Sequence, residues 1–382
     1  MSKGLSSFFD ASRWIAALMV LIYHVRLLIL LSPNQTEVRG VLFKLIYFVT
    51  GFGHAAVMIF FVISGYLVGG LTVTRLPERG FHLARFAAHR ASRIYTVLIP
   101  ALVLGGLLDL IGLRFLNQDA IYNAGATSPI ASLQFVVADN LNIRTFLGNI
   151  LMLQTLDGSI VHVFGSNGPL WSLAYEWWYY CLFAAVMVAA TRRHVVARVV
   201  GAVVFVVIIT NLPHEIIMLA PIWFMGIMAC LYNRSNLWKP PFWLGLVIMF
   251  SVLTYVRIQH PSTGASGGSQ LVFAFNDFIV GLGFAIATVA CSNRQRPLAF
   301  GVLHRTLADF SYSTYLFHFP MVLFAVAVAK VVFGIPFAQR PNLLSIGWLF
   351  FLVVIILSAC FFLSRFTERK TNAIRDKLLS CL

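Results

Sequence analysis

Ionisable side chains, among them Asp10, Arg13 and His24, interrupt the first long apolar stretch of the chain, Phe8–Leu31. Asp10 and Arg13 lie three residues apart, and His24 follows Arg13 after close to three helical turns, or about 16 Å along a helix. All three therefore share roughly one face of a helix that is long enough to cross a bilayer. Placing such groups in lipid costs free energy, so this row of ionisable side chains indicates a functional site or a polar pathway rather than a helix that only anchors the protein in the membrane.

A carboxylate is predicted at the same depth as His24. Glu176 lies in the apolar stretch Pro169–Ala190, and both side chains fall about 10 Å below the outward end of their spans. A histidine–carboxylate pair would relieve both groups, although the sequence does not show whether the two helices touch. A neutral imidazole is the commonest general base near pH 7, and a carboxylate stabilises the imidazolium that forms. This pair could therefore take the proton of an acceptor hydroxyl during acyl transfer.

A second intramembrane histidine, His318, lies in the segment YSTYLFHFP and shares a helical face with Tyr312 and Tyr315. We interpret His318 and Tyr315 as a secondary or acceptor site. The alternative for His318 is a local cap of carbonyls freed by the nearby proline. Trp171 opens an aromatic-rich run that is typical of a membrane-interface belt, and the alternative is that Trp171 and Ser172 contact an acceptor.

Arginines gather at the inward ends of the spans. Arg90 and Arg93 follow a segment rich in arginine, and they are expected at the same depth as Asp10 and Arg13. Planar guanidinium groups bind phosphates bidentately, so this rim could hold a polyanionic ligand. Two plainer explanations stay open, namely that the charge only sets the topology and attracts anionic lipid, and that Asp10 and Arg13 simply pair with each other.

The elements that must position these groups are membrane helices. The chain has 382 residues, of which 59% are hydrophobic and 11% are charged, and apolar runs of membrane length recur along it. The sequence predicts an all-α, polytopic integral membrane protein with about ten transmembrane helices in one domain, 1–382, and no soluble domain or β-barrel. The ten spans are expected near Phe8–Leu31, Ala55–Val73, Ile94–Leu113, Pro169–Ala190, Val195–Thr210, Ile216–Tyr232, Phe242–Tyr255, Leu271–Cys291, Tyr312–Phe333 and Leu344–Leu363.

Charge sets the expected orientation. With the N- and C-termini in the cytoplasm, most of the 28 Lys and Arg residues fall on the inner side, in agreement with the positive-inside rule. Residues 114–168 then form an extracytoplasmic loop, and residues 365–382 form a basic cytoplasmic tail. This topology accounts for the net charge of +15, so we expect no nucleic-acid partner. The cysteines show no ligand or redox spacing, so we expect no metal.

Six segments in order resemble the acyltransferase 3 family of bacterial integral-membrane O-acyltransferases, over essentially the full chain. They are DASRWIAALMVLIYH, FFVISGYL, RASRIY, LGNILMLQ, PLWSLAYEWWYY and FSYSTYLFHFP. The resemblance implies that His24 is the essential histidine with Arg13 as a partner, that Arg90 and Arg93 act on the acyl-CoA donor, and that Glu176 is the acidic motif residue. It also places Ser64, Gly65 and Tyr66 in the family's SG-aromatic motif, which we assign to the donor site, and it implies the stand-alone form without a fused esterase-like domain.

The predicted function is that of a bacterial inner-membrane O-acyltransferase, expected to be an O-acetyltransferase. The donor would be acetyl-CoA or another acyl-CoA at the inner face. The acceptor would be a hydroxyl of a surface or extracytoplasmic polysaccharide, such as an exopolysaccharide, or of its lipid-linked precursor. The alternative is a transporter or channel in which an intramembrane His/Glu pair relays protons. The repeated halves typical of many transporters are not found in the sequence.

Overall fold

The computed structural model describes residues 1–33, 35–38, 40–123, 133, 135–156, 161–259 and 270–381. Within these ranges the regular secondary structure is helical, apart from one isolated backbone bridge between Leu30 and Gln339, and loops and turns join the helices. The α-helices are α1 (Lys3–Ile29), α2 (Val41–Val49), α3 (Gly53–Ser64), α4 (Leu71–Thr74), α5 (Leu76–Arg79), α6 (Leu83–Phe115), α7 (Ile143–Ile150), α8 (Trp171–Thr191), α9 (Val195–Asn211), α10 (His214–Arg234), α11 (Phe242–Gln259), α12 (Gln270–Cys291), α13 (Gly301–Ala308), α14 (Ser311–Phe333), α15 (Leu343–Ser364) and α16 (Thr371–Leu379). A π-helix, η1 (Gly65–Gly70), joins α3 to α4, and short 3₁₀ turns include η5 (Gly168–Leu170) and η6 (Glu368–Lys370).

Nine helical segments within the described residues are long and apolar enough to cross a membrane. They coincide with nine of the ten predicted spans, so the prediction of an all-α polytopic membrane protein is confirmed. The remaining predicted span, Val195–Thr210, is the apolar helix α9, which is shorter than the others and packs along α8. Helix α6 begins eleven residues before the predicted start at Ile94, because the arginine-rich segment before the apolar run continues the same helix.

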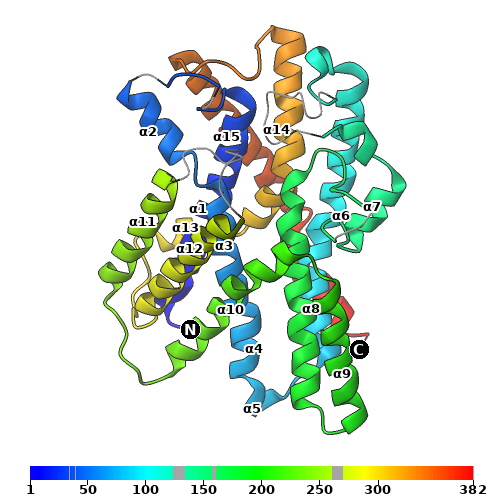
Figure 1. Cartoon of the computed structure of the whole chain (residues 1–382), viewed down its shortest axis with the longest axis vertical. Helices are drawn as coiled ribbons and strands as arrows, with labels where there is room; N and C mark the ends of the chain where they lie inside the picture. Colours follow the sequence, from blue (N-terminus) through cyan, green and yellow to red (C-terminus); the bar gives the residue numbers. More distant parts are fainter. Residues whose placement is uncertain are drawn as a thin grey trace.

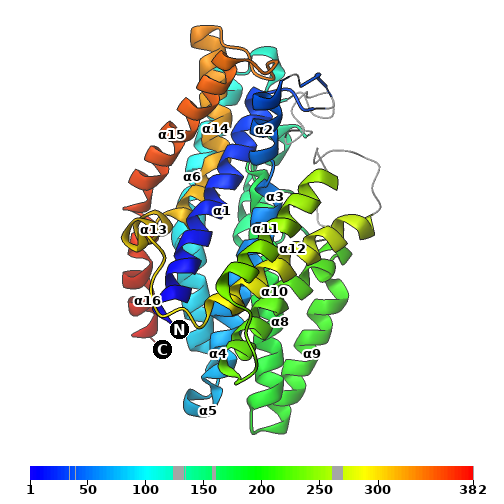
Figure 2. The ribbon, with the colours of Figure 1, turned by 90° about the vertical axis from the view of Figure 1, so that its left-hand side faces the viewer.

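Helices α6, α8 and α14 run roughly along the long axis of the molecule, as α1 does with a small tilt, whereas α10, α11 and α12 are inclined to it (Figures 1 and 2). Helix α1 lies among them and packs against α3, α14 and α13, while α14 also contacts α6. Both termini, α5 and the start of α6 lie toward the lower part of Figure 1, which we call the basic end. Helices α2 and α7 lie toward the other end, which we call the far end. Of the segment 114–168, the described part includes α7 (Ile143–Ile150).

The glycines of the segment SGYLVGG bring η1 against α10. A methyl group at Gly65 would overlap the Trp223 carbonyl oxygen, and Gly69 and Gly70 likewise leave no room beside the side chains of Ile227 and Cys230. Side-chain-free positions are needed where two backbones approach this closely. The glycine motif therefore joins two membrane helices.

A loop at the far end is held down by buried polar side chains. Asp109 of α6 accepts hydrogen bonds from the Ser166 backbone N–H (2.7 Å) and hydroxyl (2.8 Å). Asn167 donates to the Leu316 carbonyl (2.9 Å), which is the carbonyl left without a helical partner by Pro320. The proline kink in α14 thus provides an attachment point for the loop that leads into α8.

Candidate functional site

The two intramembrane histidines contact each other. His24 of α1 and His318 of α14 are joined by a hydrogen bond of 3.0 Å between His24 Nδ1 and His318 Nε2. His318 is fully buried, and its Nδ1 bonds to the carbonyl oxygens of Tyr315 (2.8 Å) and Thr314 (3.1 Å). The packing of α1 against α14 brings the two rings together.

The partners of His318 determine the tautomers of the pair. Carbonyl oxygens only accept hydrogen bonds, so the proton of a neutral His318 lies on Nδ1 and its Nε2 carries a lone pair. His24 must then donate through Nδ1–H, and its Nε2 keeps a lone pair that can accept a proton. This is the arrangement required of a general base, with a second imidazole in the orienting place usually held by a carboxylate.

Glu176 does not pair with His24, contrary to the expected histidine–carboxylate pair. Its carboxylate instead accepts a short hydrogen bond from the Tyr180 hydroxyl, one turn further along α8. The Trp223 indole N–H donates to Ser64 (3.1 Å), and Ser64 bonds to Tyr180 (2.9 Å). Because indole only donates and a carboxylate only accepts, the series of hydrogen bonds runs from Trp223 as first donor through Ser64 and Tyr180 to Glu176 as final acceptor. His24 and Glu176 therefore have separate partners, His318 and Tyr180, on different helices.

Glu176 lines a cavity of about 180 Å³ between α1, α3, α6, α8 and α14, which we call the arginine cavity. Its wall also includes Arg13, Arg90 and Arg93 together with Ser64, Ser172, Tyr180, Tyr312 and Tyr315. The structure therefore brings together three basic residues and the acidic residue that were predicted from distant segments. Gly65 and Tyr66 do not line this cavity, since Gly65 packs on α10 and the Tyr66 hydroxyl bonds to Asn233.

The three arginines of this cavity have different partners. Arg13 forms an ion pair with Asp10 (2.5 Å), so these two do pair with each other as the plainer alternative held. Arg93 pairs with Glu368 of η6 (3.0 Å) and lies over the Tyr312 ring. Arg90 lies over the Tyr180 ring, and its buried Nε has no hydrogen-bond partner among the described residues. Of the three, Arg90 keeps its charge available for a ligand.

A groove of about 630 Å³ opens at the basic end and meets the arginine cavity at Leu67, Val68 and Arg90, which line both spaces. The described residues of its wall include no acidic side chain but several basic or imidazole groups, namely Arg75, Arg79, His82, Arg85, His89 and Arg90. Leu379 of α16 also contributes. This basic groove is suited to a ligand that carries several negative charges.

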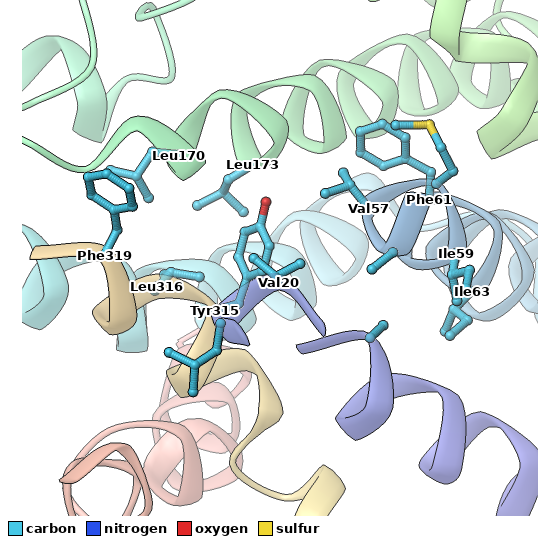
Figure 3. Close-up of a cluster of buried hydrophobic side chains, with 14 of the residues drawn as sticks. Val20, Val57, Ile59, Phe61, Ile63, Leu170, Leu173, Tyr315, Leu316 and Phe319 are labelled. Atoms are coloured by element: carbon cyan, nitrogen blue, oxygen red, sulfur yellow. The ribbon is translucent and has the colours of Figure 1, made fainter. Parts of the chain in front are cut away.

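A third cavity, of about 200 Å³, contains His24 and lies toward the far end; we call it the histidine pocket. Val57 and Tyr315 line both this pocket and the arginine cavity. The Tyr315 hydroxyl bonds to Ser172 and donates to the Pro169 carbonyl (3.2 Å). Figure 3 shows the Tyr315 ring among apolar side chains of α1, α3 and α8, including Val20, Val57 and Leu173. The three cavities thus follow one another through the bundle, with Tyr315 at the inner boundary of the histidine pocket.

Several site residues were not predicted from the sequence. His54 was not singled out from the sequence; it is exposed, and it lines the histidine pocket beside His24 and Trp171. The span was predicted to start at Ala55, whereas α3 begins at Gly53 and carries His54 in its first turn. Glu368, the partner of Arg93, gave no signal apart from its place in the basic tail. Trp171, which was predicted, lines the histidine pocket as well.

Comparison with known proteins agrees with this architecture. A family model described as an acyltransferase domain matches residues 6–365. The chain belongs to the acyltransferase 3 family. It is 24% identical over 345 residues to a protein of Shigella phage Sf6 described as an O-acetyl transferase, an alignment that covers 83% of this chain and 84% of the phage protein. No solved structure matches the chain. The chain is thus a multi-pass membrane acyltransferase, and the transporter alternative is not favoured.

Proposed function

We propose that this acyltransferase moves an acetyl group from cytoplasmic acetyl-CoA to a hydroxyl of an extracytoplasmic glycan or of its lipid-linked precursor, in the bacterial inner membrane. The observation that carries the proposal is the series of three cavities, which leads from a basic groove to a histidine with an available lone pair. The resemblance to the phage O-acetyl transferase supports acetyl as the group transferred.

The basic groove is the proposed donor site. Coenzyme A carries several phosphate charges, and the arginines of the groove complement them, while no acidic side chain in the described part of its wall opposes them. The positive-inside rule assigns the basic end to the cytoplasm, where acyl-CoA is made available. The phosphates would bind to Arg75, Arg79 and Arg85, and the thioester arm would extend past Arg90 into the arginine cavity. Oxygen atoms of this arm could accept hydrogen bonds from Arg90 Nε, which has no partner among the described residues.

The histidine pair would supply the base. The acceptor hydroxyl gives its proton to His24 Nε2 while its oxygen attacks the thioester carbonyl carbon; the carbon–sulfur bond then breaks and the coenzyme A thiolate leaves with a proton from the imidazolium. His318 Nε2 accepts from His24 Nδ1–H throughout, and this bond strengthens when His24 becomes positively charged. No group need be carried on the enzyme, so direct transfer is the simplest sequence of steps.

The geometry places one requirement on the reaction. The thioester carbon must reach the boundary at Val57 and Tyr315, where the arginine cavity and the histidine pocket meet. Rotation of the Tyr315 ring would join the two spaces, and its hydroxyl bonds to Ser172 and Pro169 hold it in the observed position. Replacement of Tyr315 by phenylalanine keeps the ring but removes both hydrogen bonds, so this variant tests the rotation of the ring separately from the other steps.

The test uses purified protein in liposomes with radiolabelled acetyl-CoA and a panel of methyl glycosides, namely those of rhamnose, glucose and galactose, as acceptors. His24→Ala should reduce acetyl transfer by about 10²–10⁴-fold, the usual contribution of a general base. The matched control is His214→Ala, because His214 is exposed at the start of α10 and lines none of the three cavities. A folded His24→Ala protein with wild-type transfer would remove the mechanism, and a wild-type protein that consumes no acetyl-CoA would remove the function.

A further inference from the structure

A second histidine, His54, lines the same pocket as His24. It lies in the first turn of α3, and its Nε2 is 2.9 Å from Asp277 Oδ2 on α12. The Asp277 side chain is 11% exposed, whereas that of His54 is 43% exposed, so the carboxylate is largely covered and the imidazole is accessible. Because a carboxylate only accepts hydrogen bonds, Nε2 of His54 carries the proton. A neutral His54 therefore presents a lone pair on Nδ1.

Aromatic surfaces adjoin this pair. The Trp171 ring is stacked on the His54 ring, with centroids 6.0 Å apart and planes inclined by 18°. Tyr23 also lines the pocket and packs against Gly53, where a methyl group would overlap its ring. The absence of a side chain at Gly53 thus allows the start of α3, and with it His54, to lie close to the helix that carries His24. Aromatic faces with a few convergent polar groups are the usual composition of a small-molecule site.

The charges of the pocket select the class of ligand. In their neutral forms His24 and His54 each offer a lone pair; His24 bonds to His318, and the carboxylate that bonds to His54 in the described part of the chain is that of Asp277. Such a site favours a ligand that donates hydrogen bonds, and it disfavours a phosphate or carboxylate group. A neutral, hydroxyl-rich molecule with an apolar face fits both the lone pairs and the aromatic rings, and about 200 Å³ is suited to a single sugar ring.

We infer that His54, held by Asp277 and stacked on Trp171, binds one hydroxyl of a neutral sugar ring so that a neighbouring hydroxyl of the same ring faces His24. The inference rests on the proposed function and deepens it, since it assigns the acceptor subsite and its ligand class. His54 and Asp277 are positioning groups here, and the proton of the reacting hydroxyl still goes to His24. The plain alternative is that the His54–Asp277 bond only ties α3 to α12.

The two explanations differ in which kinetic constant changes. With the glycoside that the wild-type protein uses best, His54→Ala should lower kcat/KM for the glycoside by about 10- to 100-fold, as expected for a lost substrate hydrogen bond and poorer alignment. Asp277→Asn should act in the same direction but less strongly, because the amide can still bond to the ring. The KM for acetyl-CoA should stay within about twofold in both variants, since neither residue lines the basic groove or the arginine cavity. His214→Ala again serves as the control.

Four results would overturn the inference. The first is an unchanged kcat/KM for the glycoside in His54→Ala. The second is an equal change in both substrates' constants together with a lowered melting temperature, which indicates a purely structural tie. The third is a better acceptor among phosphorylated sugars than among neutral glycosides. The fourth is a wild-type protein that turns over acetyl-CoA but transfers to no glycoside; this removes the subsite and leaves the acyltransferase itself intact. If His54→Ala does not fold, Asp277→Asn and Trp171→Phe decide by the same criteria.

Discussion

Replacement of His318 by phenylalanine separates the orientation of the base from the base itself. His318 is fully buried and lines none of the three cavities, so it acts on a ligand only through its bond to His24. Phenylalanine keeps a planar ring in the same place but offers no acceptor to His24 Nδ1–H. His24 would then lose the side-chain partner that stabilises its imidazolium, and only its hydrogen bond to the Val20 backbone would be left.

The size of the effect follows from the bond that is lost. A hydrogen bond to a charged group contributes about 1.5–3 kcal/mol, and each 1.36 kcal/mol changes a rate tenfold. If the bond to His318 matters mainly when His24 is protonated, kcat should fall by about 10- to 150-fold. His24→Ala should cost more, because it removes the base as well as its orientation. His318→Gln keeps an acceptor oxygen and should recover part of the loss.

The measurement is kcat for acetyl transfer and the KM for acetyl-CoA, with the melting temperature of each variant as a check on folding. We expect kcat to fall while the donor KM stays near the wild-type value. A folded His318→Phe protein with kcat within twofold of wild type would show that the histidine pair has no role in the chemistry. A raised donor KM with unchanged kcat would place His318 in donor binding, against the observed geometry.

Three further predictions follow from the arginines and the glycines. Arg90→Gln should raise the KM for acetyl-CoA about tenfold or more, because Arg90 lines both the basic groove and the arginine cavity. The melting temperature should change little, because Arg90 has no ion-pair partner among the described residues. An unchanged donor KM contradicts this role. Arg93→Gln should lower the unfolding free energy by about 1–3 kcal/mol, because it leaves the buried carboxylate of Glu368 without a counterion and with only the hydrogen bonds from Ser313, and the double change with Glu368→Gln should restore part of the melting temperature. Gly65→Ala should lower the unfolding free energy by about 1–3 kcal/mol, because the added methyl group forces η1 away from α10. Gly347→Ala on α15 meets open space, so this control variant should be neutral or slightly stabilising. Equal melting temperatures for the two variants would refute the close approach.

The membrane helices were predictable because their signal is local. About twenty apolar residues form a span whatever lies beside them, so the ends of α8, α12 and α14 agree with the sequence prediction within a few residues. The end of a span is less certain where polar residues continue the helix. Arg90 and Arg93 lie inside α6 for this reason, and His54 lies inside α3.

Lateral contacts were not predictable in the same way. Depth along the membrane follows from residue counting, and it placed His24 and Glu176 at similar levels. Which helix faces which depends on the packing of the whole bundle, and α1 turns His24 toward α14 rather than toward α8. The family resemblance named His24 and Glu176 but carried no information on their partners. The link from Arg93 to Glu368 spans most of the chain, so no short pattern could reveal it.

The tie between Arg93 and Glu368 affects how the topology of this protein can be studied. Reporter fusions that cut the chain at successive loops would remove Glu368 from every fusion protein that ends upstream of η6. Each such product would leave the Arg93 guanidinium without its counterion beside Tyr312, on the helix whose orientation is being mapped. Single-cysteine labelling of the intact polypeptide keeps this ion pair, so it is the appropriate method for assigning the two faces.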